Sequence, residues 1–461
     1  MSLSGLFLPE SVAVVGASPN MGVGKIPYYQ MIRNAGYKGR LYPINPRQTD
    51  IDGCRVYPDV ESLPEPVDLL IVAAPAKAAL GIVKAASKKG VKFVHFFTSG
   101  FSEMGEKGLE KELLEAKGAT RILGPNCLGV HCTESRVCFD PYFKQTGTGQ
   151  AAFVGQSGGI TANFLWMCES REIPVNKVVS FGNQIDITAA DMIEYMTGDD
   201  TVKVISAYIE DVRDGRRFMD VLRRAAAVKP VIMLKGGTTE LGARAAASHT
   251  GAMAGSTEIW SAAMRQCGCV EAETFEQLID MVMLATSYRP PTGRRLGFLC
   301  AGGGTAVLFT DLAASNGLSL PPLAKVTQDA IASRVKSVNT FTINPVDLGA
   351  YGFDFNIMSQ TMAEMDSDPN IDVIIPYFSI DFITTFQSDQ IESGPHAIIE
   401  TARRLKKPVI PILSMFTEDN IQKHETRIRI ARIFREAELA VFINLQDCIH
   451  ALARSSGRRP E

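Results

Sequence analysis

Short apolar runs, most of them rich in β-branched residues, alternate along the whole chain with stretches that have the spacing of helices. The runs cover residues 11–18, 67–75, 91–100, 150–159, 202–210, 229–237, 295–304, 371–378 and 407–414. A buried strand followed by a loop and a helix, repeated many times, is typical of parallel sheets with helices on both faces. The pattern therefore predicts an α/β protein built from doubly wound parallel sheets.

Two polar links divide this pattern into three α/β units. One is the glycine-containing segment 144–149, and the other is the proline-containing segment 289–293. Segments of this composition are typical of loops and boundaries. Because 461 residues exceed one ordinary domain, we expect domains at residues 1–130, 145–290 and 294–461.

The second and third units look like two copies of one unit. AAFVGQSGG (151–159) parallels LGFLCAGGG (296–304), and KPVIMLKGG (229–237) parallels KPVIPILSM (407–415). Other paired segments follow in the same order. A fixed order of similar segments indicates an internal duplication.

The two copies differ in their polar residues. An equivalent strand ends in Glu210 in the first copy and in Ser379 in the second. The first copy then continues into the loop AASHTGAMAGS (246–256), which contains His249, whereas the second copy has no histidine there. The two copies share a scaffold, but the polar residues that could carry out a reaction are found in the first copy alone. This suggests that the first copy is active and the second supports it.

Composition narrows the classes of partner. A net charge of −3 gives no reason to expect nucleic acid or an anionic membrane as a partner. The N-terminus lacks a basic segment followed by an apolar one, and no apolar run approaches ~18 residues. The nine cysteines form no C-x-x-C pair. We expect a soluble cytoplasmic protein with reduced thiols and no metal bound by this chain.

Loops after the strands of the first unit form a candidate nucleotide site. A glycine-rich turn begins at Gly16, and its amides can face a phosphate. An NAD site has an acidic residue after its second strand, which binds the ribose hydroxyls, and the strand near 40–44 is followed by none. A phosphate-bearing adenine cofactor other than NAD is therefore favoured. The candidate residues are Gly16, Ala17, Ser18, Asn45, Pro46, Arg47, Ala74, Pro75, Ser99, Gly100 and Asn126.

Two glycine-rich helix starts occupy equivalent positions in the repeat. Free N–H groups and the positive end of a helix dipole can hold an anion. If the copies pack about a pseudo-twofold axis, both starts could hold one phosphoryl group; tight helix–sheet packing is the alternative reason for the glycines. The residues are Ser157, Gly158, Gly159, Gly303, Gly304 and Thr305.

Three roles are open to His249. As a metal ligand it lacks partners nearby. As the base of a serine hydrolase it could serve the G-x-S-x-G letters at 155–159, although no Asp-then-His order supports this. As a phosphoryl acceptor it needs one ring nitrogen held by a carboxylate. Glu210 is the candidate, because the second copy lacks both residues.

At these residues the chain resembles the NDP-forming acyl-CoA synthetase family, which includes ADP-forming acetyl-CoA synthetase and succinyl-CoA synthetase. The segments SVAVVGAS, GPNCLGV, VGQSGG, GNQIDI, the Glu210 strand and ASHTGAMAGS occur in the family's order over essentially the whole chain. The resemblance implies a Rossmann-like CoA-binding domain followed by two flavodoxin-like domains of the succinyl-CoA synthetase type.

The resemblance also implies a reaction. Carboxylic acid, ATP and CoA would give acyl-CoA, ADP and phosphate, reversibly, through an acyl phosphate and a phosphohistidine at His249. Glu210 would orient the imidazole, the two helix starts would cradle the phosphohistidine, and the loops of the first unit would bind CoA.

One departure from the family pattern is informative. Fused members also carry an ATP-grasp module, and the three units here leave no room for one. The chain therefore looks like the α subunit of a split enzyme, with a separate ATP-grasp β subunit that binds most of ATP and Mg²⁺ in an α2β2 heterotetramer. The identity of the small carboxylic acid and the choice of ATP or GTP stay open.

Two other classes remain as alternatives. A non-catalytic regulatory homologue that binds CoA or acyl-CoA is disfavoured by the intact His249 and Glu210. An NAD-dependent oxidoreductase is disfavoured by the missing acidic residue after the second strand.

Overall fold

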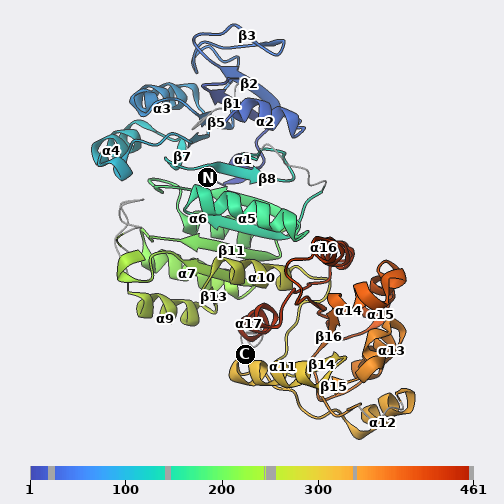
Figure 1. The fold of residues 1–461 in the computed structure, drawn as a ribbon. Helices are drawn as coiled ribbons and strands as arrows, with labels where there is room; N and C mark the ends of the chain where they lie inside the picture. Colours follow the sequence, from blue (N-terminus) through green and yellow to red (C-terminus); the bar gives the residue numbers. More distant parts are fainter. Residues whose placement is uncertain are drawn as a thin grey trace. The chain divides into compact units, whose positions relative to one another are not determined.

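The first sheet has five parallel strands in the order β2-β1-β5-β6-β7 (Figure 1). The computed structural model describes residues 2–18, 26–140, 147–242, 244, 256–335 and 340–455. The strands are β1 (Ser11–Val15), β2 (Arg40–Ile44), β5 (Leu69–Val72), β6 (Phe93–Phe96) and β7 (Arg121–Leu123). The accompanying elements are α1 (Ser4–Phe7), α2 (Tyr28–Asn34), the pair β3 (Asp50–Ile51) and β4 (Cys54–Arg55), α3 (Ala79–Lys89) and α4 (Lys107–Ala116).

The second sheet has six strands in the order β13-β12-β11-β9-β10-β8, with β8 antiparallel to its neighbour. The strands are β8 (Gly129–Cys132), β9 (Ala151–Gly155), β10 (Val175–Ser180), β11 (Val204–Ile209), β12 (Val231–Lys235) and β13 (Val270–Ala272). Helix α6 packs beside α7, and α7 packs beside α9. Because connections between parallel strands are right-handed, the step from β9 to β10, which runs opposite to the later steps along the sheet, is expected to put α5 on the other face. The helices are α5 (Gly158–Ser170), α6 (Ala189–Thr197), α7 (Gly215–Ala226) and α9 (Thr257–Cys267).

The third sheet has four parallel strands in the order β15-β14-β16-β17. The strands are β14 (Leu296–Cys300), β15 (Val346–Asp347), β16 (Val373–Ser379) and β17 (Ile412–Ser414). The helices are α10 (Phe275–Ala285), α11 (Gly303–Ser315), α12 (Lys325–Arg334), α13 (Phe355–Asp366), α14 (Ile380–Phe386), α15 (Ser393–Arg404), α16 (Ile421–Glu436) and α17 (Leu445–Ser455).

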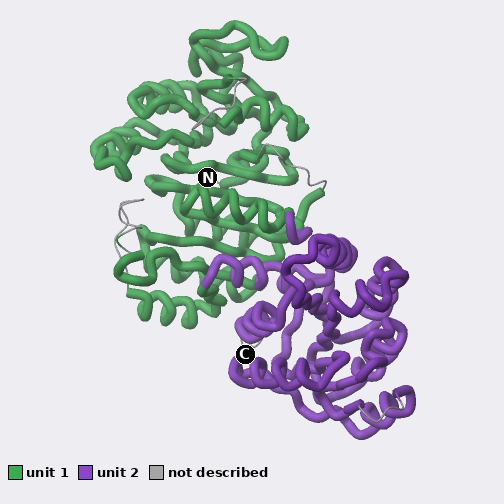
Figure 2. Tube along the Cα trace, in the orientation of Figure 1, with its two compact units in different colours: residues 1–169, 174–273 green, residues 170–173, 274–461 purple. Residues whose placement is uncertain are grey.

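The chain divides into two compact units (Figure 2). Unit 1 comprises residues 1–169 and 174–273 and holds the first two sheets. Unit 2 comprises residues 170–173 and 274–461 and holds the third. The division falls before α10, earlier than the link at 289–293, and β8 belongs to the second sheet although it starts inside the segment 1–130.

The predicted duplication is visible in the second and third sheets. Without β8, the strands of the second sheet follow the chain order 2-1-3-4-5, and those of the third follow 2-1-3-4. Phe153 stacks on Phe164 at 4.2 Å between ring centroids, and Phe298 stacks on Phe309 at 3.8 Å. In both copies the helix phenylalanine follows the strand phenylalanine by eleven positions (164 − 153 and 309 − 298). Both copies therefore keep the same strand-to-helix packing.

Each predicted apolar run contains a strand, as the α/β interpretation requires. Strand β10 was not among the predicted runs, because it carries Asn176 and Lys177, both fully buried. The Lys177 ammonium is 2.6 Å from a carboxylate oxygen of Asp199 and 2.7 Å from the side-chain oxygen of Asn176. Buried charges need such partners, and local sequence does not show them.

Polar side chains cap the N-termini of the four helices α6, α7, α9 and α10. Thr188 and Asp191 form a capping box at α6, and the side chains of Asp214, Ser256 and Thr274 accept amide hydrogens at α7, α9 and α10. Each satisfies a first-turn donor that has no partner within its helix. These caps fix where the four helices start.

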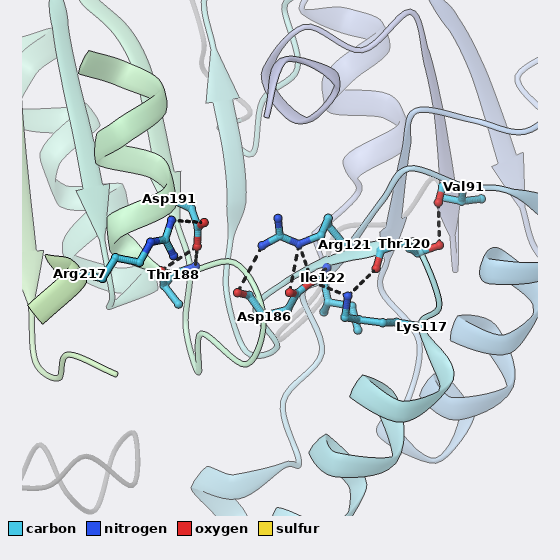
Figure 3. A network of polar contacts seen from close by, with 9 residues as sticks. All are labelled: Val91, Lys117, Thr120, Arg121, Ile122, Asp186, Thr188, Asp191 and Arg217. Carbon is cyan, nitrogen blue, oxygen red and sulfur yellow. Dashed lines mark hydrogen bonds and ion pairs between the residues drawn. The ribbon is translucent and has the colours of Figure 1, made fainter. Parts of the chain in front are cut away.

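A charged network connects the first two sheets inside unit 1 (Figure 3). Asp186, in the segment after β10, accepts hydrogen bonds from the Nε of Arg121 at 3.0 Å and from the amide of Ile122 at 2.8 Å. The Lys117 ammonium lies 3.5 Å from the same carboxylate. All three side chains are mostly buried, so this ion pair is less screened by solvent than a surface pair.

Within the described part of the chain, no helix combines the length and the apolar composition needed to cross a membrane. All nine cysteines are free thiols. Among the described residues no group of histidine, cysteine and carboxylate side chains could hold a metal ion.

Candidate functional site

The first sheet opens a hollow at its topological switch point. Strands β1 and β5 are neighbours, and the chain runs from β1 outward in one direction and from β5 in the other. Ligands of open α/β sheets bind at the carboxyl ends of such strands. The hollow there, called the β1/β5 hollow, has a volume of about 800 Å³. It is lined by Gly16, Ser18, Ile26, Pro27, Asn45, Arg47, Gln48, Ala73, Ala74, Pro75, Ala76, Phe97, Thr98, Ser99 and Asn126.

Most residues proposed from the sequence for this site line the hollow together. Ala17, Pro46 and Gly100 are the predicted residues that do not line it. The sequence reasoning missed the apolar and amide neighbours, such as Ile26, Gln48 and Phe97, because nothing local distinguishes them from ordinary loop residues. The arrangement gives a large site with small apolar residues along its floor and a few polar groups.

The glycine-rich turn contributes differently from the expectation. The amides of Gly16 and Ala17 both donate to the carbonyl of Ile44, at 2.9 and 3.2 Å, so these two amides are not available to a phosphate. Gly16 has a φ of +82°, and a Cβ there would lie 2.3 Å from the Ala73 carbonyl oxygen. The chain that leaves β5 at Ala73 therefore leaves space at position 16 for glycine but not for a residue with a side chain. Among the described residues that line the hollow, Arg47 is the one with a charged side chain.

The second sheet places Glu210 at its own switch point, between β9 and β11. Glu210 follows β11 directly and is 6 % exposed. The side-chain oxygen of Gln156, after β9, accepts hydrogen bonds from the amides of Glu210 at 2.8 Å and Asp211 at 2.9 Å. The Gln156 amide donates to the carbonyl of Tyr208 at 3.0 Å. Gln156, which the sequence reasoning did not single out, therefore fixes the backbone that carries Glu210.

The surroundings of the Glu210 side chain are tightly packed. The Tyr208 hydroxyl bonds to the Glu210 carboxylate, and burial, followed by the charge of Glu210, raises the pKa of Tyr208. A Cβ on Gly236 would lie 2.4 Å from the Tyr208 hydroxyl and 3.1 Å from Cγ of Glu210. Glycine at this position thus leaves space for the carboxylate.

Lys235, the last residue of β12, lies beside Glu210. Its ammonium donates to the main-chain carbonyl of Glu210 at 2.9 Å, and burial lowers the pKa of Lys235. Gly236 donates its amide to the carbonyl of Ile209 at 2.9 Å. The chain leaving β12 therefore passes directly beside Glu210.

His249 itself lies outside the described residues. Its loop leaves from the Lys235–Gly236 end of β12, and α9 begins at Thr257 on the far side. The Thr257 hydroxyl donates to the carbonyl of Thr238 at 2.6 Å, so the two ends of the loop lie together. Glu210 therefore lies beside the described residues that lead from β12 toward the His249 loop, and the pairing of Glu210 with His249 stays a prediction.

The start of α5 lies beside the same strand ends. The Ser157 carbonyl accepts the Thr161 amide at 3.0 Å, so Ser157 occupies the position before the first turn. A Cβ on Gly155 would lie 2.1 Å from the Thr161 hydroxyl, and one on Gly158 would lie 3.2 Å from Leu128. A Cβ on Gly159 would meet nothing within 4 Å. Close packing therefore explains the glycines at positions 155 and 158. Gly159, in contrast, faces open space at the positive end of the helix dipole.

The start of α11 is occupied by a carboxylate. Asp347, 6 % exposed, accepts the Gly302 amide at 2.9 Å, and a Cβ on Gly303 would lie 3.3 Å from its other oxygen. A carboxylate at a helix N-terminus uses the field that an anion would use. Gly304 again faces open space, and Thr305 bonds to Tyr377. The two helix starts are therefore not equivalent, and their convergence on one phosphoryl group stays a prediction.

A smaller hollow lies at the switch point of the third sheet. This β14/β16 hollow has a volume of about 200 Å³ and a largely aromatic wall. The sequence reasoning did not find it, because its rings come from separate elements. It is lined by Ala301, Thr305, Gly352, Phe353, Tyr377, Phe378, Ser379, Asp381, Phe382, Ile383 and Phe416.

Two family models match the chain. The model described as a CoA binding domain matches residues 10–133, and the model described as a succinyl-CoA ligase like flavodoxin domain matches residues 148–285. The first match contains every residue of the β1/β5 hollow, and the second contains Gln156 and Glu210.

Named relatives and solved structures match most of the chain. The α subunit of ADP-forming acetate–CoA ligase II of Pyrococcus furiosus is 34% identical over 89% of this chain and 89% of its own. The α subunit of ligase I from the same organism is 39% identical over 69% of this chain and 71% of its own. Acetyl-coenzyme A synthetase 1 of Ca. Korarchaeum cryptofilum, solved with phosphate and ADP, has a TM-score of 0.87 at 29% identity, covering 98% of this chain and 96% of that chain.

Proposed function

This chain belongs to the family of ADP-forming acetate–CoA ligases, and from that membership we propose that it is the α subunit of an ADP-forming acyl-CoA synthetase. The reaction joins a carboxylic acid to CoA and converts ATP to ADP and phosphate. The observation that carries the proposal is the position of Glu210, which Gln156 holds at the end of β11, beside the residues that lead from β12 toward the His249 loop. The family relatives, named as ligases, argue against a non-catalytic CoA-binding homologue.

The residues of the second sheet carry the phosphoryl transfer in this proposal. A ring nitrogen of His249 attacks the γ-phosphorus of ATP, the bond to ADP breaks, and His249 then passes the phosphoryl group to an oxygen of the acid. Glu210 holds the other ring nitrogen as a donor, which fixes the tautomer that can attack. The first-turn amides of α5 at Ser157, Gly158 and Gly159 stabilise the charge of the transferred group.

The β1/β5 hollow holds CoA in the same proposal. Small residues on its floor, such as Gly16 and Ala74, leave space for an extended ligand, and Arg47 supplies charge for its phosphates. The CoA sulfur attacks the acyl carbon of the acyl phosphate, the carbon–oxygen bond to phosphate breaks, and the thiol proton is lost. Ser99 and Asn126 line the same wall as further polar contacts for CoA.

A separate ATP-grasp β subunit completes the enzyme. We propose that it binds ATP and Mg²⁺, that an α2β2 heterotetramer forms, and that Gly303, Gly304 and Thr305 assist the phosphohistidine. The named α-subunit relatives support a split enzyme. The free thiols agree with a cytoplasmic enzyme.

Labelling tests the function directly. The α chain, incubated with acetyl-CoA and [³²P]phosphate, should acquire acid-labile label on His249 without any β subunit. Addition of ADP, Mg²⁺ and an ATP-grasp β subunit from the same organism should move the label to ATP. A chain that binds acetyl-CoA but never acquires label would contradict the catalytic role and support the non-catalytic alternative. The acid is then identified by ADP release with a panel of carboxylic acids.

The Arg47 contact predicts a selective effect on CoA. In the reconstituted complex, Arg47→Ala should raise KM for CoA about 10-fold, because a charged hydrogen bond to a phosphate is worth roughly 1.5–3 kcal/mol. The KM values for ATP and the acid should change less than twofold. Arg55→Ala is the matched control, since Arg55 is an exposed arginine on β4 that does not line the hollow. Equal changes in both variants would show that Arg47 acts only through net charge.

A further inference from the structure

Residues 124–129, called the 124–129 loop, comprise the connection after β7 and the first residue of β8, and they link the β1/β5 hollow with the start of α5. The side of the loop at Asn126 lines the hollow. Two positions further on, Leu128 lies against α5, where a Cβ on Gly158 would be 3.2 Å from it. Both contacts are within unit 1. The position of this 124–129 loop therefore sets the geometry of both regions.

The second sheet holds one side of the 124–129 loop through its main chain. The Asn183 amide donates to the carbonyl of Pro125 at 3.0 Å, and the Ile185 amide donates to that of Gly124 at 3.2 Å. Gly182, with a φ of +53°, has no space for a Cβ, which would lie 2.2 Å from the Pro125 carbonyl oxygen. This side of the loop is fixed by backbone contacts that a side-chain substitution does not remove.

The first sheet holds the other side through two side chains. His95, on β6 and 2 % exposed, has Nε2 3.0 Å from the carbonyl oxygen of Cys127. Tyr28 donates its hydroxyl to the carbonyl of Leu128 at 2.9 Å, and its ring meets the His95 ring edge-on at 5.7 Å. The two consecutive carbonyls between Asn126 and Gly129 are thus each held by one buried ring.

Gly129 shows how closely His95 approaches the loop. A Cβ on Gly129 would lie 2.2 to 2.6 Å from three atoms of the His95 ring, and Gly129 has a φ of +84°. Because a carbonyl can only accept, Nε2 must carry the hydrogen. Burial lowers the pKa of His95 to about 4, so the imidazole is neutral at neutral pH and keeps a single donor toward Cys127.

We propose that His95 is a positioning residue for the acyl-transfer half of the reaction: through Cys127 it holds Asn126 at the CoA site and Leu128 against the start of α5. The inference rests on the proposed function and adds a buried residue that does not line the β1/β5 hollow. Loss of the His95 donor should loosen the segment between Asn126 and Leu128, whereas the contacts to 182–185 remain.

The test uses the reconstituted α–β complex and two substitutions of His95. His95→Met removes the donor and keeps an apolar side chain of comparable length. His95→Gln keeps a donor near the Nε2 position. We expect His95→Met to raise KM for CoA about 10-fold and to lower kcat. We expect His95→Gln to bring KM for CoA back to within about threefold of the wild-type value. Formation of phosphohistidine from ATP, which needs no CoA, should fall by a smaller factor than KM for CoA rises in His95→Met, because only the Leu128 contact of α5 is affected, and it should return toward the wild-type rate in His95→Gln.

His131→Met is the matched control, because among the described residues of unit 1 His131 is the other buried histidine, and it lies on β8. It should lower thermal stability without raising KM for CoA. The proposal is wrong if KM for CoA is unchanged in His95→Met, if both Met variants raise it alike, or if a folded His95→Gln complex fails to restore it.

Tyr28→Phe covers the case in which His95→Met does not fold. It removes only the hydroxyl that donates to Leu128 and should raise KM for CoA about threefold in the same direction; no increase would count against the proposal. A wild-type complex without CoA-dependent ADP release would instead refute the proposed function, so the two failures are distinguishable.

Discussion

Replacing His249 with alanine should abolish turnover of the α–β complex, by about 10⁴-fold or more, because in the proposed mechanism it removes the nucleophile through which every phosphoryl group passes. Acid-labile ³²P label from ATP and from phosphate with acetyl-CoA should both disappear. CoA binding, measured by calorimetry, should be retained, since the β1/β5 hollow is built from other segments. The loss would therefore be confined to kcat and to the label.

His396→Ala serves as the matched control for His249→Ala. His396 is an exposed histidine on α15, in unit 2. This variant should keep full activity and full label. Label that persists in His249→Ala would mean that another residue is the phosphoryl acceptor.

Replacing Glu210 with glutamine should slow phosphorylation of His249 about 100-fold, because in the proposed mechanism Glu210 orients the imidazole, and carboxylates that orient metal-binding histidines contribute about 10–100-fold in the same way. The amide group can keep the Tyr208 contact and the shape of the site, but it lacks the charge that stabilises an imidazole as it becomes cationic. Rapid-quench measurement of labelled α chain after mixing with ATP and the β subunit gives this rate. KM for CoA should be unchanged.

Asp211→Asn is the matched control for Glu210→Gln. Asp211 is the next residue, and its amide donates to the same Gln156 oxygen. The substitution changes one carboxylate to an amide at the same strand end, so an effect of overall charge would appear in both variants. A phosphorylation rate in Glu210→Gln equal to that in Asp211→Asn would leave Glu210 with a structural role only.

Glycines show where sequence reasoning about the site was incomplete. The glycine-rich segments at Gly16 and at Gly155–Gly159 were interpreted as anion-binding turns. In the structure, Gly16 and Gly155 are required by neighbouring atoms at 2.3 and 2.1 Å from a Cβ, and only Gly159 of the α5 segment faces open space. The same residue type serves both purposes, and the distinction depends on which strand or helix lies opposite.

Two aspartates of the repeat make the same point. The sequence alone aligns residues 183–186 with 344–347, which pairs Asp186 with Asp347. In the structure Asp347 lies on β15 in register with Cys300, whereas the residue of β10 in register with the equivalent Gly155 is Ser180, so Asp186 lies beyond the end of its strand. Strand register therefore separates the two aspartates, which a comparison of the segments themselves could not show.

The α/β class and the internal duplication could be predicted from the sequence alone, because they follow from patterns between near neighbours along the chain and from the comparison of two similar segments. The pairing of Glu210 with His249 came from the same comparison and stays a prediction, since His249 lies outside the described residues. Three features became visible only in the folded chain: Gln156 holds the Glu210 backbone, the Gly16 amide is bonded within the protein, and His95 contacts the 124–129 loop. Each of these contacts depends on strand order, which brings together residues far apart in the chain and is not encoded in any single segment.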